Sequence, residues 1–172
     1  LDEMRKAQMA EGQTARYDGL CSQLTAEDVA AQKTAGTPFV VRMKVPASGV
    51  CAIQDRLRGA IEIDYAQVDM QVLQKTDGFP TYHLAVVVDD AAQGVTDVVR
   101  GVDLFEATHG QRLLQALLGL SVPQYHHHPL VLGSDGRRLA KRDAGETLAA
   151  LRATGADPAA LRTALLAQSP TC

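Results

Sequence analysis

The sequence has few cysteines and no long apolar segment. Its three cysteines are too few and too widely spaced for a disulfide framework, and they lie at Cys21, Cys51 and Cys172. No apolar run approaches the roughly 20 residues that a membrane-spanning helix needs. The sequence does not open with the charged and apolar regions of a secretory signal. These absences predict a cytoplasmic protein without a membrane anchor.

The composition is that of an ordinary globular protein, with 46% hydrophobic and 22% charged residues. A length of 172 residues allows one substantial hydrophobic core. The net charge of −3 excludes a generally basic surface, although basic residues gathered on one face could still bind nucleic acid. The sequence starts with Leu1 in the middle of a helical pattern and contains no internal repeat. We therefore expect it to be part of a longer protein.

The first half of the sequence predicts short helices followed by a small antiparallel patch at residues 38–76. Residues 1–12 form an amphipathic pattern, and Thr25 is a good N-cap for a short helix. Residues 39–45 alternate between apolar and basic side chains, which predicts a half-buried strand. Two further short strands are expected, at residues 61–64 and 70–74.

The second half predicts a parallel sheet. Residues 84–88 are continuously apolar, as in a strand covered on both faces, and residues 95–99 are expected to form another strand. Thr108 and Gln111 have the spacing of a capping box at the start of a helix. Residues 129–132 predict the next buried strand. A strand, a helix and a strand in this order predict a right-handed βαβ crossover and an α/β fold.

The last part of the sequence predicts two short helices. Residues 145–154 form one of them, and residues 158–167 form the other. Asp157 is expected to cap the second helix, and Pro158 suits its first position because the missing N–H would have no partner there.

A basic segment follows residues 129–132. It runs from Gly136 to Arg142 and places four cationic side chains in seven positions. A loop of this kind after a strand suits a polyphosphate, because Lys is a mobile point charge and Arg offers a planar fork of donors. The alternative is an ordinary solvated surface loop.

Three consecutive histidines, His126 to His128, look like a metal cluster but do not predict one. Adjacent residues of an extended segment point to alternate faces, so three in a row cannot converge on one ion. We expect them to have a structural role or to pack against the edge of an adenine ring. Asp89 and Asp90 are not assigned to a metal either, and are expected to orient backbone and basic groups at a strand end.

Residues 77–90, 94–101 and 136–142 together resemble the second half of the catalytic domain of class I aminoacyl-tRNA synthetases that activate glutamate. The first segment contains Asp-Gly-Phe-Pro-Thr-Tyr-His, and the second ends in Val-Val-Arg-Gly. The third, Gly-Arg-Arg-Leu-Ala-Lys-Arg, is similar to the KMSKS loop of that class in its glutamate-enzyme form. The resemblance implies ATP-dependent activation of glutamate and its transfer to a tRNA.

The resemblance also implies how the chain is divided. Residues 1–76 are expected to be part of a connecting insertion with α+β structure, and residues 77–144 the second half of a Rossmann-like catalytic domain. Residues 145–172 are expected to form C-terminal helices. The HIGH motif of the family and the small-residue turn before it, which bind ATP from the first half of the domain, do not occur in the sequence. We therefore expect the chain alone to be inactive.

The basic loop is assigned to ATP by the resemblance. Lys141 matches the second lysine of the family motif and Arg142 the residue after it, and both are expected to be catalytic. Negative charge develops on the leaving pyrophosphate, so cations that contact it most strongly in the transition state lower the barrier. Ala140 stands where the family commonly has Ser. The further ATP-binding residues implied by the resemblance are Arg138, Leu139 and Val131.

Arg100 and Tyr82 are assigned to glutamate by the same resemblance. Arg100 follows the strand at residues 95–99, at the carboxyl end where ligands of open α/β sheets bind, and its fork can take a carboxylate with two bonds. Tyr82 is expected to line the same pocket through its hydroxyl. The alternatives are that Arg100 pairs with Asp97 or Asp103 and that Tyr82 packs in the core.

Cofactors and partners follow from the resemblance as well. Cys21 lies in a segment that supplies one thiolate of a zinc site in several glutamyl enzymes. A single cysteine cannot hold structural zinc, so zinc is expected only in a complete chain. ATP and Mg²⁺ are the expected cofactors, and glutamate and tRNA are the expected partners of a protein that is a monomer and does not contact a membrane.

Two members of the family fit different parts of the sequence. Residues 1–80 are more similar to glutamyl-tRNA synthetases, which charge the acceptor end of tRNA(Glu). Residues 100–150 are more similar to glutamyl-queuosine tRNA(Asp) synthetases, and the end of the chain soon after residue 167 favours this short form if that end is genuine. The sequence also leaves open a truncated paralogue that binds nucleotide or tRNA without reacting, and an α/β domain whose basic loop is only surface.

Overall fold

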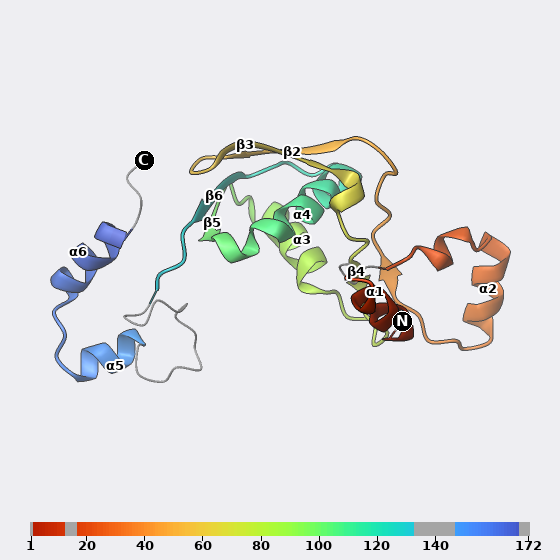
Figure 1. Ribbon diagram of the computed structural model, residues 1–172, viewed down its shortest axis with the longest axis horizontal. Helices are drawn as coiled ribbons and strands as arrows, with labels where there is room; N and C mark the ends of the chain where they lie inside the picture. Colours follow the sequence, from red (N-terminus) through yellow and green to blue (C-terminus); the bar gives the residue numbers. More distant parts are fainter. Residues whose placement is uncertain (1, 13–16, 133–146, 169–172) are drawn as a thin grey trace.

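The computed structural model describes residues 2–12, 17–132 and 147–168. At its centre is a four-stranded sheet with one helix packed against a face of it and a second helix packed on the first (Figure 1). No described strand pairs with the outer edge of β5, which is the last strand of the sheet. In order across the sheet, the strands are β3 (Gly59–Asp64), β2 (Val50–Asp55), β6 (Gln124–His128) and β5 (Asp97–Gly101).

The predicted βαβ crossover is present and consists of β5, α4 and β6. The two strands pair in parallel, from Asp97 opposite Gln124 to Gly101 opposite His128. Helix α4 (Phe105–Leu118) connects them and ends at Gly119, whose φ of 64° is accessible to glycine at little cost. This parallel pair with its helix confirms the predicted α/β class.

The strand expected at residues 84–88 is wrong, because this run lies inside helix α3 (Tyr82–Gln93). An apolar run of five residues cannot be told from a buried helical segment by its period alone. In the structure, Val87 is buried in a cluster with Leu113 and Leu114 of α4. The apolar side chains of this run therefore cover a neighbouring helix.

Two other expected boundaries are also wrong. Thr108 is not an N-cap, because α4 already begins at Phe105 and Thr108 lies inside its first turn. Residues 129–132 do not form the strand that follows α4, which is β6 in the histidine run. Tyr125 and His127 of β6 face inward and are only 3% and 1% exposed. β6 is thus a strand of mostly polar residues that is buried on one face, and its polar composition is the reason that the sequence does not predict it.

The antiparallel patch expected at residues 38–76 is divided between two sheets. The hairpin of β2 and β3 joins the main sheet, because Asp55 of β2 pairs in parallel with Tyr125 of β6. The strands β1 (Val41–Arg42) and β4 (Val72–Gln74) form a separate antiparallel pair. The strands expected near residues 61–64 and 70–74 are thereby confirmed, whereas β2 was not predicted.

Two apolar clusters form the core of the described structure. The first contains Leu113 and Leu114 of α4 together with Met43 and Val45, which follow β1. The second contains the buried residues of β2 and β6, namely Cys51, Ile53 and Tyr125. Because β2 alternates between buried and exposed residues, its inward side also carries Asp55, whose side chain is buried among the polar groups described below.

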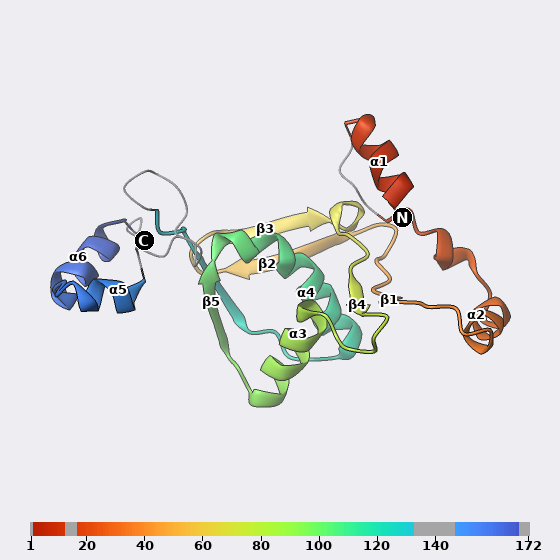
Figure 2. The same ribbon diagram turned by 90° about the horizontal axis from the view of Figure 1, so that it is seen from below.

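Four helices lie outside this central unit. In both views α1 (Asp2–Ala10) and α2 (Ala26–Thr34) lie at one end of the described structure, and α5 (Leu148–Ala153) and α6 (Pro158–Gln168) at the other (Figure 1, Figure 2). Thr25 and Asp28 cap α2 reciprocally, and Asp157 accepts from the Ala159 amide at 2.9 Å at the start of α6. No described helix is long and apolar enough to cross a membrane. The described residues also contain three short 3₁₀ helices: η1 (Leu20–Gln23), η2 (Tyr65–Gln67) and η3 (Val102–Leu104).

Candidate functional site

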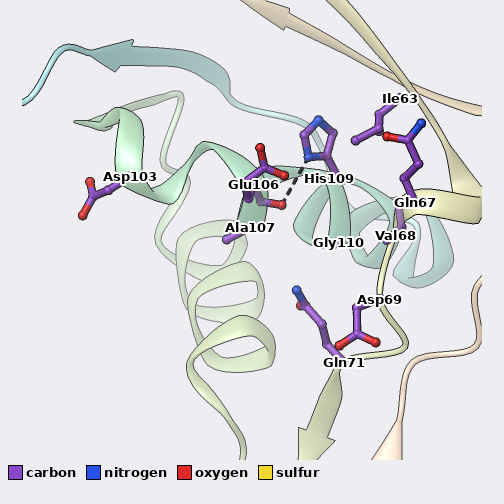
Figure 3. Close-up of a pocket in the computed structure, with 10 residues that line it drawn as sticks. All are labelled: Ile63, Gln67, Val68, Asp69, Gln71, Asp103, Glu106, Ala107, His109 and Gly110. Carbon is purple, nitrogen blue, oxygen red and sulfur yellow. Dashed lines mark hydrogen bonds between the residues drawn. The ribbon is translucent and has the colours of Figure 1, made fainter. Parts of the chain in front are cut away.

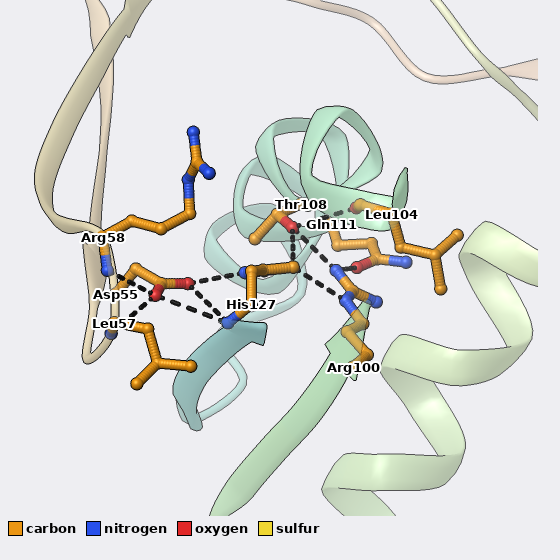
Figure 4. A network of polar contacts seen from close by, with 8 residues as sticks. All are labelled: Asp55, Leu57, Arg58, Arg100, Leu104, Thr108, Gln111 and His127. Atoms are coloured by element: carbon orange, nitrogen blue, oxygen red, sulfur yellow. Dashed lines mark hydrogen bonds and ion pairs between the residues drawn. The ribbon is translucent and has the colours of Figure 1, made fainter. Parts of the chain in front are cut away.

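Arg100 lies near the carboxyl end of β5 and points toward the first turns of α4 (Figure 4). Its Nε donates a hydrogen bond to Nε2 of His127 at 3.0 Å. Its Nη2 donates to Oγ1 of Thr108 and to Oε1 of Gln111, both at 2.7 Å. Three of the five N–H groups of the guanidinium are therefore used, and the two on Nη1 have no partner among the described residues.

All three acceptors of Arg100 are uncharged. Among the described residues, no carboxylate forms an ion pair with its guanidinium. The alternative pairing with Asp97 is wrong, because the Asp97 carboxylate accepts from Nε2 of His126 at 3.0 Å and from the Thr96 hydroxyl at 2.9 Å. An Arg held by neutral groups keeps its positive charge available to an anionic ligand.

His127 connects Arg100 to a buried carboxylate. Its Nδ1 lies 2.5 Å from Oδ2 of Asp55, and both side chains are completely buried. Since Arg100 can only donate, Nε2 of His127 must be the acceptor, and the ring proton must lie on Nδ1 and be donated to Asp55. The contacts thus define one neutral tautomer of His127.

The pKa values of this pair agree with that assignment. Burial lowers the pKa of His127, and the charge of Arg100 lowers it further, whereas the bond to Asp55 acts in the opposite direction. Burial raises the pKa of Asp55, but hydrogen bonds from the His127 side chain and from nearby backbone amides outweigh this effect and leave it below its ordinary value. Asp55 is therefore a carboxylate beside a neutral imidazole.

The backbone of the β2–β3 turn holds Asp55 in place. Its Oδ1 accepts from the amides of Leu57 at 2.9 Å and Arg58 at 3.0 Å. Its Oδ2 accepts from the His127 amide at 3.2 Å in addition to the imidazole. These bonds satisfy both oxygens, which is what keeps a buried carboxylate ionised.

Two aromatic rings enclose the His127 imidazole. Tyr125 stacks on it with a centroid distance of 5.8 Å, and Phe105 meets it edge to face at 5.2 Å. The Arg100 guanidinium also lies over the Tyr125 ring, 5.6 Å from its centroid. These walls leave the imidazole little freedom to rotate.

Two buried polar atoms near Arg100 have no partner among the described residues. Gln111 is 2% exposed and turns its Oε1 to Arg100, which leaves its Nε2 without an acceptor. This amide nitrogen lies on the same side of the network as the unused end of the Arg100 guanidinium (Figure 4). On α3, Nδ1 of His83 is likewise unpartnered, and burial and then the charge of Arg100 lower the pKa of this histidine. Unpaired donors and acceptors gathered around a cation are typical of a polar ligand site.

Tyr82 is the first residue of α3 and is 51% exposed. Its ring meets that of His83 edge to face at 5.6 Å, and no hydrogen bond joins it to Arg100. The alternative that Tyr82 packs in the core is therefore wrong. Tyr82 is linked to Arg100 indirectly: its ring contacts His83, whose pKa is lowered by burial and then by the charge of the Arg100 guanidinium.

The described structure also has a separate hollow of about 420 Å³ beside α4 (Figure 3). It is bordered by the loop between β3 and β4 and by the first turns of α4, and it includes neither Arg100 nor Tyr82. Its lining carries three carboxylates, on Asp69, Asp103 and Glu106. The charged groups that line the hollow are acidic, whereas Arg100 is basic, so the hollow is not part of the site around Arg100.

Comparisons with known proteins agree with this geometry. The family model for class I tRNA synthetases (E and Q), catalytic domain, matches residues 1–169. The chain belongs to this family. The chain is 49% identical over 142 residues to the glutamate–tRNA ligase of Marinomonas sp., and 46% identical over 161 residues to that of Psychrobacter cryohalolentis. These matches cover 83% and 94% of the chain but only 29% and 32% of the relatives.

Solved synthetase structures have the same fold. The crystal structure of a glutamate–tRNA synthetase from Elizabethkingia anophelis matches with a TM-score of 0.75 and 30% identity, over 83% of this chain and 30% of that one. A glutamate tRNA ligase from Elizabethkingia meningosepticum, solved in complex with its amino acid, matches to the same extent. The chain thus spans about a third of the length of a synthetase.

Most residues assigned to ATP lie outside the described part of the synthetase chain. Arg138, Leu139, Lys141 and Arg142 fall within residues 133–146, so their assignment stays a prediction. Val131 is described, and it lines a groove with residues of the two C-terminal helices. The groove is bordered by Leu148 of α5 and by Pro158, Leu161, Arg162, Leu165 and Leu166 of α6.

The predicted remnant of a zinc site also has a place in the structure. Cys21 is exposed and free, in the 3₁₀ helix η1, and its amide donates to the Tyr17 hydroxyl at 2.7 Å. No group of three or more potential metal ligands occurs among the described residues. Asp89 and Asp90 lie on α3 and not at a strand end, so the role expected for them is wrong.

Sequence reasoning missed the roles of Asp55, Thr108 and Gln111 in the site. Asp55 lies 72 residues before His127 and ends a strand that was not predicted. Thr108 and Gln111 were expected only to cap a helix. The feature that could have revealed Asp55 is the alternation of inward- and outward-facing side chains along β2 and β6. Once these two strands are paired, the alternation places Asp55 beside the histidine run.

Proposed function

We propose that this chain forms the second half of the catalytic domain of a glutamate–tRNA ligase, which activates glutamate with ATP and transfers it to tRNA. The family match and the names of the most similar relatives support this assignment. Those relatives favour the acceptor end of tRNA(Glu) over the queuosine base of tRNA(Asp), and they favour an enzyme over a non-catalytic paralogue. We expect the enzyme to act as a cytoplasmic monomer.

The observation that carries the proposal is the uncompensated charge of Arg100. Its guanidinium is partly buried, it is anchored only by neutral acceptors, and one end of it is unused. An anion at this end would gain a charge-assisted hydrogen bond with no competing carboxylate to displace. The side-chain carboxylate of glutamate is such an anion.

The hydrogen bonds of Arg100 also define how a carboxylate would bind. A two-bond fork along the Nε and Nη2 edge is blocked, because His127, Thr108 and Gln111 already accept from those nitrogens. The carboxylate would instead meet Nη1, and the unpartnered Nε2 of Gln111 is a second donor on the same side. Tyr82 would close the site from the first turn of α3.

ATP and its metal are assigned to the same enzyme. Lys141 and Arg142 would contact the phosphates, and Arg138, Leu139 and Val131 would help to bind the nucleotide. Mg²⁺ characteristically binds through substrate phosphates and keeps several waters, so it does not need a dedicated protein cage.

Glutamate-dependent exchange of pyrophosphate into ATP tests the proposed function. We expect exchange when the chain is joined to the sequence that supplies the first half of the catalytic domain, and none with the 172-residue chain alone. Glutamine and aspartate should not replace glutamate. Absence of exchange in the completed enzyme, or exchange that does not depend on glutamate, would overturn the proposal.

A further inference from the structure

We propose that Asp55 and His127 are positioning residues that hold Arg100 in the orientation in which Nη1 faces the amino acid. The inference rests on the proposed role of Arg100 in glutamate binding. It assigns a function to a buried pair that lies one contact away from the ligand.

Arg100 is already ordered before a ligand binds. An Arg side chain has several rotatable bonds, and ordering it costs conformational entropy that must be recovered elsewhere. In this structure the ordering does not await the ligand, because His127, Thr108 and Gln111 accept from the guanidinium. A receptor group that is already oriented binds more tightly than a mobile one.

Asp55 selects the tautomer of His127 that Arg100 needs. Only an imidazole with a bare Nε2 can accept from Nε of Arg100, and the carboxylate of Asp55 favours that form by accepting the proton on Nδ1. In the other tautomer, two N–H donors would face each other across 3.0 Å. Asp55 therefore acts on Arg100 through the choice of tautomer.

The imidazole of His127 separates the Asp55 carboxylate from Arg100. A carboxylate placed directly on Arg100 would occupy the donors and compete with the ligand. The intervening imidazole leaves the unused donors of the partly buried cation available to the ligand.

The variant Asp55→Asn tests the chain of contacts with almost no change of shape. The Leu57 and Arg58 amides require an oxygen at the Oδ1 position, so the new NH₂ group must occupy the Oδ2 position and face Nδ1 of His127. That arrangement favours the wrong tautomer. In the completed synthetase we expect the KM for glutamate to rise about 10- to 100-fold, as for a misplaced binding group, with the KM for ATP within about twofold.

Asp97→Asn is the matched control. Asp97 also accepts from a histidine of β6, but its partner His126 has no described contact with Arg100, and the pair is exposed. The control should leave the KM for glutamate within about twofold of the wild-type value. An equal effect of both substitutions would overturn the proposal.

A double-mutant cycle separates positioning from a general structural role. If Asp55 acts through Arg100, Asp55→Asn should add less than about twofold to the glutamate KM of an Arg100→Ala enzyme, although it still lowers Tm. Full additivity would overturn the proposal. If wild-type enzyme shows no glutamate-dependent exchange, the proposed function fails instead.

Two readouts keep the test decisive if Asp55→Asn folds poorly. The ¹⁵N spectrum of His127 in the wild-type chain should show a protonated Nδ1 and a bare Nε2, whatever the activity; the reverse pattern would overturn the proposal. His127→Leu should raise the glutamate KM at least about tenfold, and His127→Gln, whose amide oxygen can still accept from Arg100, should restore much of the loss. Equal loss in both variants would count against an acceptor role for His127.

Discussion

Arg100 and His127 are directly opposite each other in the register of two adjacent parallel strands, and their side chains are joined by a hydrogen bond of 3.0 Å. The bond links a cation on the edge strand to a ring on the strand next to it. Asp55 and the aromatic rings that hold the imidazole of His127 therefore also orient the guanidinium of Arg100.

We expect Arg100→Lys to be a severe change in the completed synthetase. An ammonium cannot donate to His127, Thr108 and Gln111 and still present a further donor to the ligand. The loss should appear in kcat/KM for glutamate and amount to about 2–5 kcal/mol, with the KM for ATP nearly unchanged. Steady-state exchange kinetics check this, with Arg152→Lys at an exposed position of α5 as control. A lower Tm with normal glutamate kinetics would contradict it.

Gln111→Glu should weaken glutamate binding without unfolding the protein. The new carboxylate would pair with Arg100 and remove the unpartnered amide donor beside it. Because hydrogen bonds to charged groups contribute about 1.5–3 kcal/mol, the KM for glutamate should rise at least about tenfold. Gln124→Glu adds the same charge at an exposed position of β6 and should leave the KM unchanged. Unaltered glutamate kinetics in Gln111→Glu would exclude this residue from the site.

Stability should fall as the pH falls below about 6.5, the ordinary pKa of histidine. The folded-state pKa values of His127 and His83 lie below that value, so the unfolded chain binds protons that the folded chain does not. Their contribution to stability is therefore complete above about pH 6.5 and is lost as the pH drops toward the folded-state values. Each such histidine contributes at most about 1.4 kcal/mol per pH unit. Urea unfolding between about pH 5 and 8 measures the slope, which should decrease in His127→Gln.

The thiols of Cys21 and Cys51 should react at very different rates. Cys21 is exposed, whereas Cys51 is 4% exposed and burial raises its pKa, so little of the reactive thiolate forms. In a Cys172→Ser background, a thiol reagent such as DTNB should label one cysteine quickly and the second only on unfolding. Rapid reaction of two thiols in the folded chain would show that the β2 side of the core is open.

Lys141→Ala should lower the rate of adenylate formation much more than it weakens ATP binding, because its charge is used mainly as the phosphates separate. Loss of one preorganised donor commonly reduces the rate about 10²- to 10³-fold. Pre-steady-state adenylate formation and the KM for ATP separate the two effects. An increase in KM alone would mark Lys141 as a residue that binds substrate and transition state equally.

The local signals of the sequence predicted much of the fold. The cap at Thr25 and the Asp157–Pro158 helix start are encoded within a few residues, and both are confirmed. The expected parallel βαβ crossover is present, although its second strand is β6 and not residues 129–132. The run at residues 84–88 was misassigned because its period does not distinguish a strand from a helix that packs on α4.

The site was harder to predict than the fold. The roles of Arg100 and Tyr82 were assigned by a resemblance. For the histidine run two roles were left open, a structural one and packing against an adenine edge, and the burial of His127 agrees with the first. The pairing of Asp55 with His127 could not be read from the sequence, since it depends on a single parallel contact between β2 and β6. The orientation of Arg100 depends in turn on that pairing.

The outer edge of β5 has a consequence for handling the chain. An edge strand presents a row of N–H and C=O groups that can pair with any other extended segment, and no strand in the described part of the chain pairs with this edge of β5. The side chain of Val99, which is 67% exposed, adds apolar surface to the same strand. Produced without a segment that covers this edge, the chain should self-associate as its concentration rises. A fusion that supplies a parallel strand beside β5 should then give a monodisperse protein suited to crystals and spectra.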